Sequence, residues 1–474
     1  MNNRAYLLKM DNDSVVFAKL PNSIAGPPFH TTASEVATRT FLAEVLDIPT
    51  PRILAWSARK ANPVGAEYIL EERASGQPLG ALWQDWNKLP LLNRFGIIRE
   101  IVKMERKLAE TIFQHCGSIY FKDDFPRGED IKLADTCTVS PSTLGRYTLG
   151  PMVGIDFWQE AKAGMDLDRG PFNGPLEFLK GKAVGEMKFI QKHGRPRLNI
   201  ARSLTEPEQP EEMLELLNQY LQLIPAMIPP STTDDLHGST LWHPDLHLDN
   251  MLIDTRTMQV TSVIDWQSTI AAPFFLQCGV PKLLLHSEPL SFDFSALKRP
   301  DNYMDLTQEE REEADHRRGN KHLLKYYLEI TKRDNPRHWA ALTSHNEIRV
   351  QPARLVQHVW EQNIMFFLKL ALMKIVNRWE QFCPDAGPCP VNFNQIDQAV
   401  FDFEAENREA VGSVLSLLQE KYNLHPEGNV VSARYDEMQI EMMRLKAGFL
   451  SGAADEEERL LADKLWPYQD TVES

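Results

Sequence analysis

Two short segments decide the fold: residues 243–250 read HPDLHLDN, and residues 263–266 read VIDW. An apolar run at 251–253 follows the first segment directly, and further apolar residues lead into Asp265. The polar residues 254–257 between these runs are typical of a hairpin turn. We therefore expect one short hairpin to bring the polar loop and Asp265 together.

Three oxygen-bearing side chains stand on these segments, at Asp245, Asn250 and Asp265. Phosphoryl transfer requires such a set, because one carboxylate orients or deprotonates a hydroxyl while an amide oxygen and a second carboxylate hold Mg²⁺ against ATP phosphates. These oxygen ligands suit magnesium better than zinc. The alternative is a polar turn whose Asp and Asn side chains bond only to nearby backbone groups. The complete order of loop, strand, turn and strand favours the phosphoryl-transfer site.

The N-terminal region offers a second set of charged residues. Residues 15–20 form a strand-like run that carries Lys19, and a turn at 11–13 joins it to a second strand-like run, residues 4–10. In phosphoryl-transfer proteins a strand lysine of this kind contacts the ATP phosphates. The alternative is a surface charge on an edge strand.

An apolar helix pattern follows at residues 33–46, with Glu35 in its first turn. Glu35 could pair with Lys19 and hold the ammonium over the α- and β-phosphates of ATP. Thr32 and Glu35 also fit the capping-box spacing, so a purely local role at the helix start stays open.

Four motifs carry a resemblance to a known family: residues 31–38 (TTASEVAT), 48–52 (IPTPR), 68–72 (YILEE) and 243–247 (HPDLH). With them the chain resembles aminoglycoside phosphotransferase-like proteins, including the fungal proteins called altered inheritance of mitochondria protein 9. The resemblance covers most of residues 1–285. It implies an α+β, bilobal protein-kinase-like fold, with a small antiparallel-sheet lobe, a large and mostly helical lobe, and ATP in the cleft.

The resemblance also implies roles for single residues. Asp245 takes the position of the catalytic base, and the acceptor is a small-molecule hydroxyl. His247 falls where protein kinases often place a phosphate-contacting Lys, and an imidazolium there could stabilise negative charge. A neutral His247 bonded to backbone is the alternative, while His243 is expected to brace the loop. The remaining roles are magnesium ligands (Asn250, Asp265), phosphate-positioning residues (Lys19, Glu35) and an adenine-binding backbone hinge (Glu71, Glu72, Arg73).

One departure from the family pattern concerns the small lobe. In the family a Gly-containing turn between the first two strands covers the phosphates, whereas the first glycine here is Gly26, beyond Lys19. Either the sequence lacks the first strand of that lobe, or the protein has no phosphate lid. Without this turn ATP loses backbone N–H contacts. A pseudokinase-like binding or scaffolding protein is therefore the alternative function.

Composition limits the classes of partner and compartment. The chain has 474 residues, 43% of them hydrophobic, and a net charge of −15, so we expect two lobes or domains and no nucleic-acid partner. Five cysteines, Cys137 among them, indicate reduced thiols and an intracellular location, cytoplasmic or mitochondrial. No stretch is long and apolar enough for a transmembrane segment. Nothing in the sequence indicates an oligomeric state.

We expect three regions along the chain. Residues 1–72 form the small lobe, residues 73–285 form the large lobe with the loop at 243–250 and Asp265, and residues 286–474 are a helical extension. Apolar periodicity predicts helices over the following residues: 91–116, 176–192, 210–223, 307–331, 355–378, 397–422 and 432–448.

Overall fold

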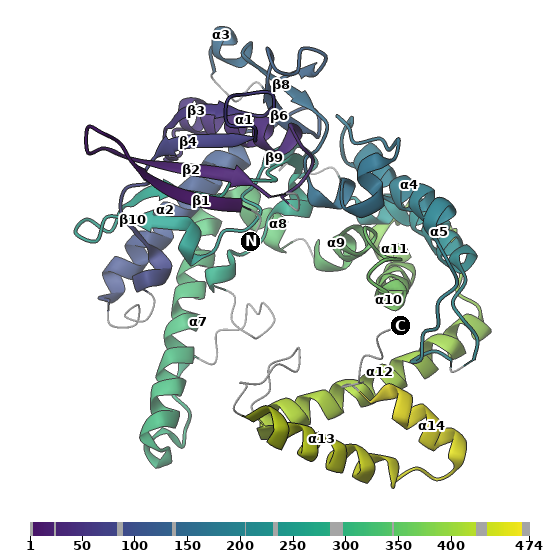
Figure 1. Ribbon diagram of the computed structural model, residues 1–474. Helices are drawn as coiled ribbons and strands as arrows, with labels where there is room; N and C mark the ends of the chain where they lie inside the picture. The colour runs from purple at the N-terminus through teal and green to yellow at the C-terminus, as the bar shows by residue number, and fades with distance from the viewer. Residues whose placement is uncertain are drawn as a thin grey trace. The chain divides into compact units, whose positions relative to one another are not determined.

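The structure is a computed structural model that describes residues 3–22, 25–82, 89–134, 139–203, 205–230, 236–284, 297–343, 346–422 and 434–466. The chain forms two compact units (Figure 1). The first comprises Met1–Phe189, Ile224–His358 and Gln381–Cys383, and the second comprises Ile190–Leu223, Val359–Glu380 and Pro384–Ser474. All residues predicted to form the site lie in the first unit.

The N-terminal part of the first unit is a four-stranded sheet with the order β1-β2-β4-β3 (Figure 1). Its strands are β1 (Asn3–Lys9), β2 (Val15–Pro21), β3 (Ile53–Ser57) and β4 (Tyr68–Glu72), and every neighbouring pair is antiparallel. The hairpin turn predicted before β2 is confirmed. Lys19 does not lie on an edge strand, because β2 is paired on both sides. Within the described residues β1 is the edge of this sheet, and no glycine-bearing turn precedes Lys19.

Helix α1 (His30–Leu46) follows β2 and begins earlier than predicted. The capping box at Thr32 is wrong, because Phe29 is the N-cap residue and the Thr32 hydroxyl donates to Glu67 Oε2 at 2.8 Å. The other oxygen of Glu67 accepts the backbone N–H of Phe29 at 3.1 Å. A carboxylate distant in sequence thus satisfies the helix start, which leaves Glu35 free to face the sheet.

A second small sheet, with the order β6-β8-β7, packs against α1. It consists of β6 (Ser118–Phe121), β7 (Glu129–Asp130) and β8 (Tyr147–Gly150). Phe41 of α1 is fully buried, with its ring 5.4 Å from that of Tyr147. Burying such a side chain contributes about 1.5–3 kcal/mol. Helix α1 is therefore held on the side of this second sheet as well as on the side of β3 and β4.

Short strands carry the polar loop. Strand β10 (Met251–Ile253) pairs with β11 (Val260–Val263) and with β5 (Gln77–Pro78), while β9 (Ser239–Leu241) pairs with β12 (Ala271–Pro273). The predicted hairpin between β10 and β11 is confirmed. Asp254 Oδ1 closes its turn by accepting the N–H groups of Arg256 at 2.7 Å and Thr257 at 3.1 Å.

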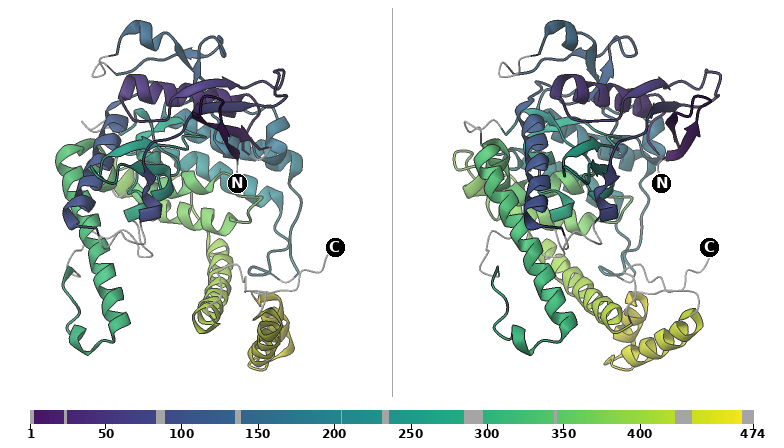
Figure 2. Two further views of the ribbon diagram at one scale, coloured as in Figure 1. Left: turned by 60° about the vertical axis from the view of Figure 1, so that its left-hand side comes forward. Right: turned by 90° about the vertical axis from the view of Figure 1, so that its left-hand side faces the viewer.

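Helices make up most of the remaining described chain, and α2 lies beside α7 (Figure 2). Three predictions were wrong in extent. Helix α2 ends at Glu110, before the predicted end at residue 116. Helix α5 continues through Pro225, and residues 355–378 are not one helix, because left-handed backbone at His358 and Asn363 separates α9 from α10. The helices are α2 (Leu91–Glu110), α3 (Pro141–Leu144), α4 (Pro175–His193), α5 (Pro210–Met227), α6 (Phe274–Gln277), α7 (Gln308–Asp334), α8 (Pro336–Thr343), α9 (Asn346–Leu355), α10 (Met365–Val376), α11 (Trp379–Phe382), α12 (Gln395–Tyr422), α13 (Tyr435–Leu450) and α14 (Glu456–Leu465).

Further expectations concern cysteines and membranes. The described cysteines, Cys116, Cys278, Cys383 and Cys389, are free thiols, and Cys137 lies outside the described residues. Among the helices that the structure describes, none combines the length and apolarity needed to cross a bilayer. The start of the helix predicted at 432–448 lies partly outside the described residues, and α13 covers the rest.

A buried acid–imidazole contact joins α2, α7 and α8. Tyr327 donates its hydroxyl to Glu105 Oε2 at 2.8 Å, and His338 Nδ1 lies 3.7 Å from the same oxygen. Burial raises the pKa of Glu105 from 4.5 to about 8 and lowers the pKa of His338 from 6.5 to about 3. Both groups are therefore neutral near pH 6, and the contact is not an ion pair there.

These opposite shifts predict the pH range of greatest stability. The raised pKa of Glu105 removes stability as pH rises between 4.5 and about 8, and the lowered pKa of His338 removes it as pH falls between 6.5 and about 3. The two effects cancel between pH 4.5 and 6.5, where the contact's contribution is flat. Above pH 6.5 Glu105 alone titrates, so about 2 kcal/mol is lost by pH 8. Urea unfolding across pH should show this loss in wild type and not in Glu105→Gln. An equal loss in both would disprove it.

Candidate active site

The lysine and glutamate of the N-terminal lobe are in contact. Lys19 Nζ donates to Glu35 Oε1 at 2.8 Å and to Oε2 at 2.9 Å. The side chains are only 10% and 3% exposed. Because β2 and α1 supply one member each, the packing of α1 against the sheet fixes the position of the ammonium.

Asp265 lies two residues after the end of β11 and contacts the same lysine. Its Oδ1 lies 3.3 Å from Lys19 Nζ, and half of its side chain is exposed. Asp265 has a left-handed backbone, with φ +62°, which costs about 1–2 kcal/mol in a non-glycine residue.

The loop at 243–250 is bonded directly to the residue before Asp265. His243 Nε2 donates to the carbonyl of Ile264 at 2.9 Å, and the N–H of Ile264 donates to the carbonyl of Asn250 at 3.0 Å. His243 Nδ1 in turn accepts the N–H of Asp245 at 3.1 Å, and burial lowers its pKa to about 4. A neutral His243 therefore braces the loop, and both ends of the loop are hydrogen-bonded to Ile264, the residue before Asp265.

Asn250 and Asp245 are linked within the loop. Asn250 is buried, and its Nδ2 donates to the carbonyl of Asp245 at 2.9 Å, which fixes the orientation of the side-chain amide. The Asp245 side chain is half exposed. Its pKa is lowered, chiefly by a hydrogen bond from Lys282. His247 Nε2 lies 3.7 Å from Asp245 Oδ2, while His247 Nδ1 accepts the N–H of Asp249.

These donors fit a magnesium ion in kind. Mg²⁺ in phosphoryl-transfer proteins uses one or two carboxylates together with phosphate oxygens and water. Asp265 offers a half-exposed carboxylate, and Asn250 offers an amide whose nitrogen is already occupied by the loop. In the described part of the chain there is no cluster of three or more His, Cys, Asp or Glu of the kind that holds a metal with protein ligands alone.

The hinge residues predicted at the end of β4 have different environments. Glu71 pairs in the ladder with Phe17 and Ile53, and its side chain turns into the lobe and contacts Arg39. Glu72 binds Arg52 at the surface, with Arg52 Nε donating at 3.0 Å. Arg73 follows β4, is exposed and lies outside the ladder.

Sequence reasoning missed two residues that support or border the site, Arg39 and Lys282, and a third residue, Gln267, also contacts this region. Arg39 lies 3.7 Å from Glu35 and also contacts Glu71, so it couples two buried carboxylates. Gln267 bonds to Asn3 of β1 at 2.7 Å and to the carbonyl of Ala25, and so links the segment after Asp265 to the sheet. Lys282 contacts Asp245. Apart from the Arg39–Glu35 pair within α1, each contact joins residues distant in sequence, and no local pattern marks it.

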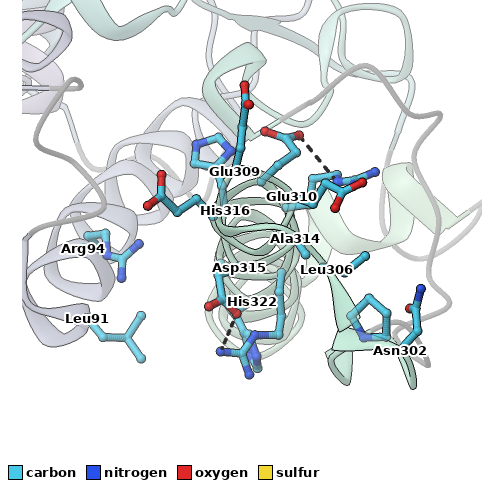
Figure 3. Close-up of a pocket in the computed structure, with 16 residues that line it drawn as sticks. Leu91, Arg94, Asn302, Leu306, Glu309, Glu310, Ala314, Asp315, His316 and His322 are labelled. Atoms are coloured by element: carbon cyan, nitrogen blue, oxygen red, sulfur yellow. Dashed lines mark ion pairs between the residues drawn. The ribbon is translucent and has the colours of Figure 1, made fainter. Parts of the chain in front are cut away.

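A separate hollow of about 1320 Å³ lies beside α7 (Figure 3). It is lined by the start of α2, by residues between 300 and 306, and by the first half of α7. Many of its charged side chains pair with each other, such as Arg317 with Glu313 at 3.5 Å and Arg318 with Asp315 at 3.5 Å. No predicted site residue is among the residues that line it, and we assign it no function.

A sheet lobe with a buried Lys–Glu pair thus contacts a hairpin that carries Asp265, next to the loop with Asp245 and Asn250, in an α+β fold. Residues 164–274 match the model of the phosphotransferase enzyme family, APH. The match includes the polar loop and Asp265. Residues 164–274 are thus similar to the APH family, and the resemblance stated from the motifs is confirmed in this region.

Similar proteins are found in fungi and among solved structures. A subtelomeric hrmA-associated cluster protein of Aspergillus fumigatus is 28% identical, over 99% of this chain and 95% of that protein. Altered inheritance of mitochondria protein 9, mitochondrial, of Lachancea thermotolerans is 25% identical over 65% of this chain and 52% of its own length. Aminoglycoside phosphotransferase APH(4)-Ia, as a thermostable mutant with ADP and hygromycin B, is 12% identical with a TM-score of 0.34, covering 79% of this chain and 89% of that chain. A fructosamine-3-kinase homologue from Thermobifida fusca is 13% identical with a TM-score of 0.35, covering 79% and 89% respectively.

Proposed function

We propose that this protein is an ATP- and Mg²⁺-dependent phosphotransferase that acts on the hydroxyl group of a small molecule. The observation that carries the proposal is the 3.3 Å contact between Lys19 and Asp265. The residue before Asp265, Ile264, is hydrogen-bonded to both ends of the loop that carries Asp245. A phosphate-binding cation, a metal-binding carboxylate and a base thus converge from three parts of the chain. Phosphoryl transfer depends mainly on such positioning and on charge stabilisation.

Each residue has a defined task in the proposed reaction. Lys19, oriented by Glu35, binds the α- and β-phosphates, and Asp265 and Asn250 hold magnesium. The bound ion would neutralise charge on the phosphates. Asp245 orients the acceptor hydroxyl and receives its proton. We propose that backbone groups near Glu71, Glu72 and Arg73 contact adenine.

We extend the proposal to lobes and location. The small lobe would span residues 1–72, the large lobe 73–285, and a helical extension 286–474. The pairing of β5 with β10 just beyond Glu72 supports a crossing at that point. Some relatives carry the word mitochondrial in their names, which supports an intracellular, cytoplasmic or mitochondrial location.

A pseudokinase-like scaffold is the second candidate function. It is favoured by one observation: Lys282 occupies one oxygen of Asp245. Such a protein would bind nucleotide weakly or not at all and would form no ADP.

The two functions differ in ADP formation from Mg·ATP with water as the acceptor. We expect slow ADP release by the wild type and a fall of about 10² or more in Asp245→Asn, because the base is lost while the metal ligands remain. Asp249→Asn is the matched control in the same loop and should keep the wild-type rate. Equal rates in wild type and Asp245→Asn would refute the role of Asp245, and weak or absent ATP binding without ADP formation would favour the scaffold.

A further inference from the structure

Lys282 approaches the proposed base from outside the loop. Its Nζ donates to Asp245 Oδ1 at 2.7 Å, and the side chain is 71% exposed. An exposed ion pair of this kind contributes at most about 1 kcal/mol to folding. Its position beside a reacting group therefore has more bearing on chemistry than on stability.

The backbone that carries Lys282 is anchored. The short 3₁₀ turn Lys282–Leu284 buries Leu283 and Leu284 in the main hydrophobic core. Just upstream, Gln277 Nε2 donates to the carbonyls of Thr240 at 2.7 Å and Ala272 at 3.1 Å. Buried neighbours thus hold the turn in place, while the flexible side chain of Lys282 extends from it toward the loop.

The loop itself supplies only an imidazole on the other side of Asp245. His247 Nε2 lies 3.7 Å from Oδ2, beyond hydrogen-bond distance, and its Nδ1 is occupied by the N–H of Asp249 at 3.2 Å. Among the residues that the structure describes, Lys282 is therefore the cationic side chain in hydrogen-bond contact with the proposed base. Any hydroxyl that binds Asp245 will lie next to this ammonium.

We propose that Lys282 is a further catalytic residue, whose ammonium contacts the phosphoryl group as it passes to the acceptor hydroxyl held by Asp245. This inference rests on the proposed function. In the step, a bond forms between the acceptor oxygen and the γ-phosphorus. The bond from that phosphorus to the β–γ bridging oxygen breaks, and its electron pair leaves with ADP. The hydroxyl proton passes to Asp245.

Lys282 transfers no proton in this step. Its hydrogen bond shifts from Asp245 Oδ1 to a phosphoryl oxygen as negative charge moves onto that group. The shift also releases the carboxylate to take the proton at the moment when the hydroxyl reacts.

Binding of a phosphoryl-group mimic tests the proposal without a known acceptor. The wild-type protein is titrated with Mg·ADP, and then with Mg·ADP plus aluminium fluoride, which imitates the transferred phosphoryl group. Affinity is followed by calorimetry and by the thermal unfolding midpoint. We expect aluminium fluoride to tighten nucleotide binding by the wild type, and Lys282→Met to lose most of that gain while it binds Mg·ADP as before. Lys282→Arg should keep part of the gain.

Lys122→Met is the matched control, because Lys122, directly after β6, forms an exposed ion pair with Asp130 of β7 at 2.5 Å. It should behave as the wild type. An equal fluoride-dependent gain in wild type and Lys282→Met, or no gain in the wild type despite Mg·ADP binding, would overturn the role of Lys282. Failure of the wild type to bind Mg·ADP would instead refute the proposed function, and the inference about Lys282 with it.

Discussion

Replacement of Arg39 by methionine is expected to lower the free energy of unfolding by about 3–5 kcal/mol, the usual cost of breaking a buried ion pair. The Arg39 side chain is 4% exposed and contacts both Glu71 and Glu35. It also donates to the carbonyl of Pro51 at 3.0 Å. Its removal leaves two buried carboxylates with one cation fewer, since only Lys19 still pairs with Glu35. Urea unfolding at neutral pH, compared with the wild type, measures the loss.

A double variant separates lost charge pairing from lost packing. Burial raises the pKa of Glu71, and Arg39 opposes that effect. Glu71→Gln combined with Arg39→Met should therefore recover part of the stability, because the unpaired carboxylate is gone. If Arg39→Met costs less than about 1 kcal/mol, the typical value for an exposed pair, the buried network does not exist as described.

Replacement of Asp265 by asparagine is expected to reduce ADP formation from Mg·ATP by about 10³ or more. A metal ligand lost from a phosphoryl-transfer site removes several kcal/mol of transition-state stabilisation, and each 1.36 kcal/mol is a factor of ten. Fold and loop should persist, because the backbone bonds at Ile264 do not involve this side chain. Asp265→Asn and the wild type would be assayed for ADP release from Mg·ATP.

Asp254→Asn is the control for this experiment. Asp254 sits at the other end of the same hairpin and accepts two backbone N–H groups, a task that an asparagine oxygen can also perform. Its activity should match the wild type. Comparable rates in Asp265→Asn and the wild type would exclude Asp265 as a metal ligand.

The predictable parts of the molecule are those whose residues are close to one another in the sequence. The loop, the strand β10, the Asp254 turn and the strand before Asp265 follow one another in sequence, and each has a recognisable pattern. The strand that carries Lys19 and the helix with Glu35 were predictable for the same reason. Family resemblance then added roles that no periodicity could supply.

The parts that were missed depend on contacts between distant segments. Glu67 satisfies the helix start, for which the sequence offered a capping box at Thr32 as an alternative, and Arg39 and Lys282 contact carboxylates on other elements. The predicted helix at 355–378 was wrong because left-handed residues at His358 and Asn363 interrupt an otherwise apolar run. Neither residue is a glycine or a proline, so no helix-breaking signal was visible.

The central claim is that Lys19, Asp265 and Asn250 form a magnesium-dependent ATP site. Its most direct test is titration calorimetry of the wild-type protein with ATP, with and without Mg²⁺, and with Asp265→Asn as the reference. We predict saturable one-to-one binding that requires Mg²⁺ and is lost in Asp265→Asn. Absence of binding, or equal binding by Asp265→Asn and the wild type, would contradict the claim.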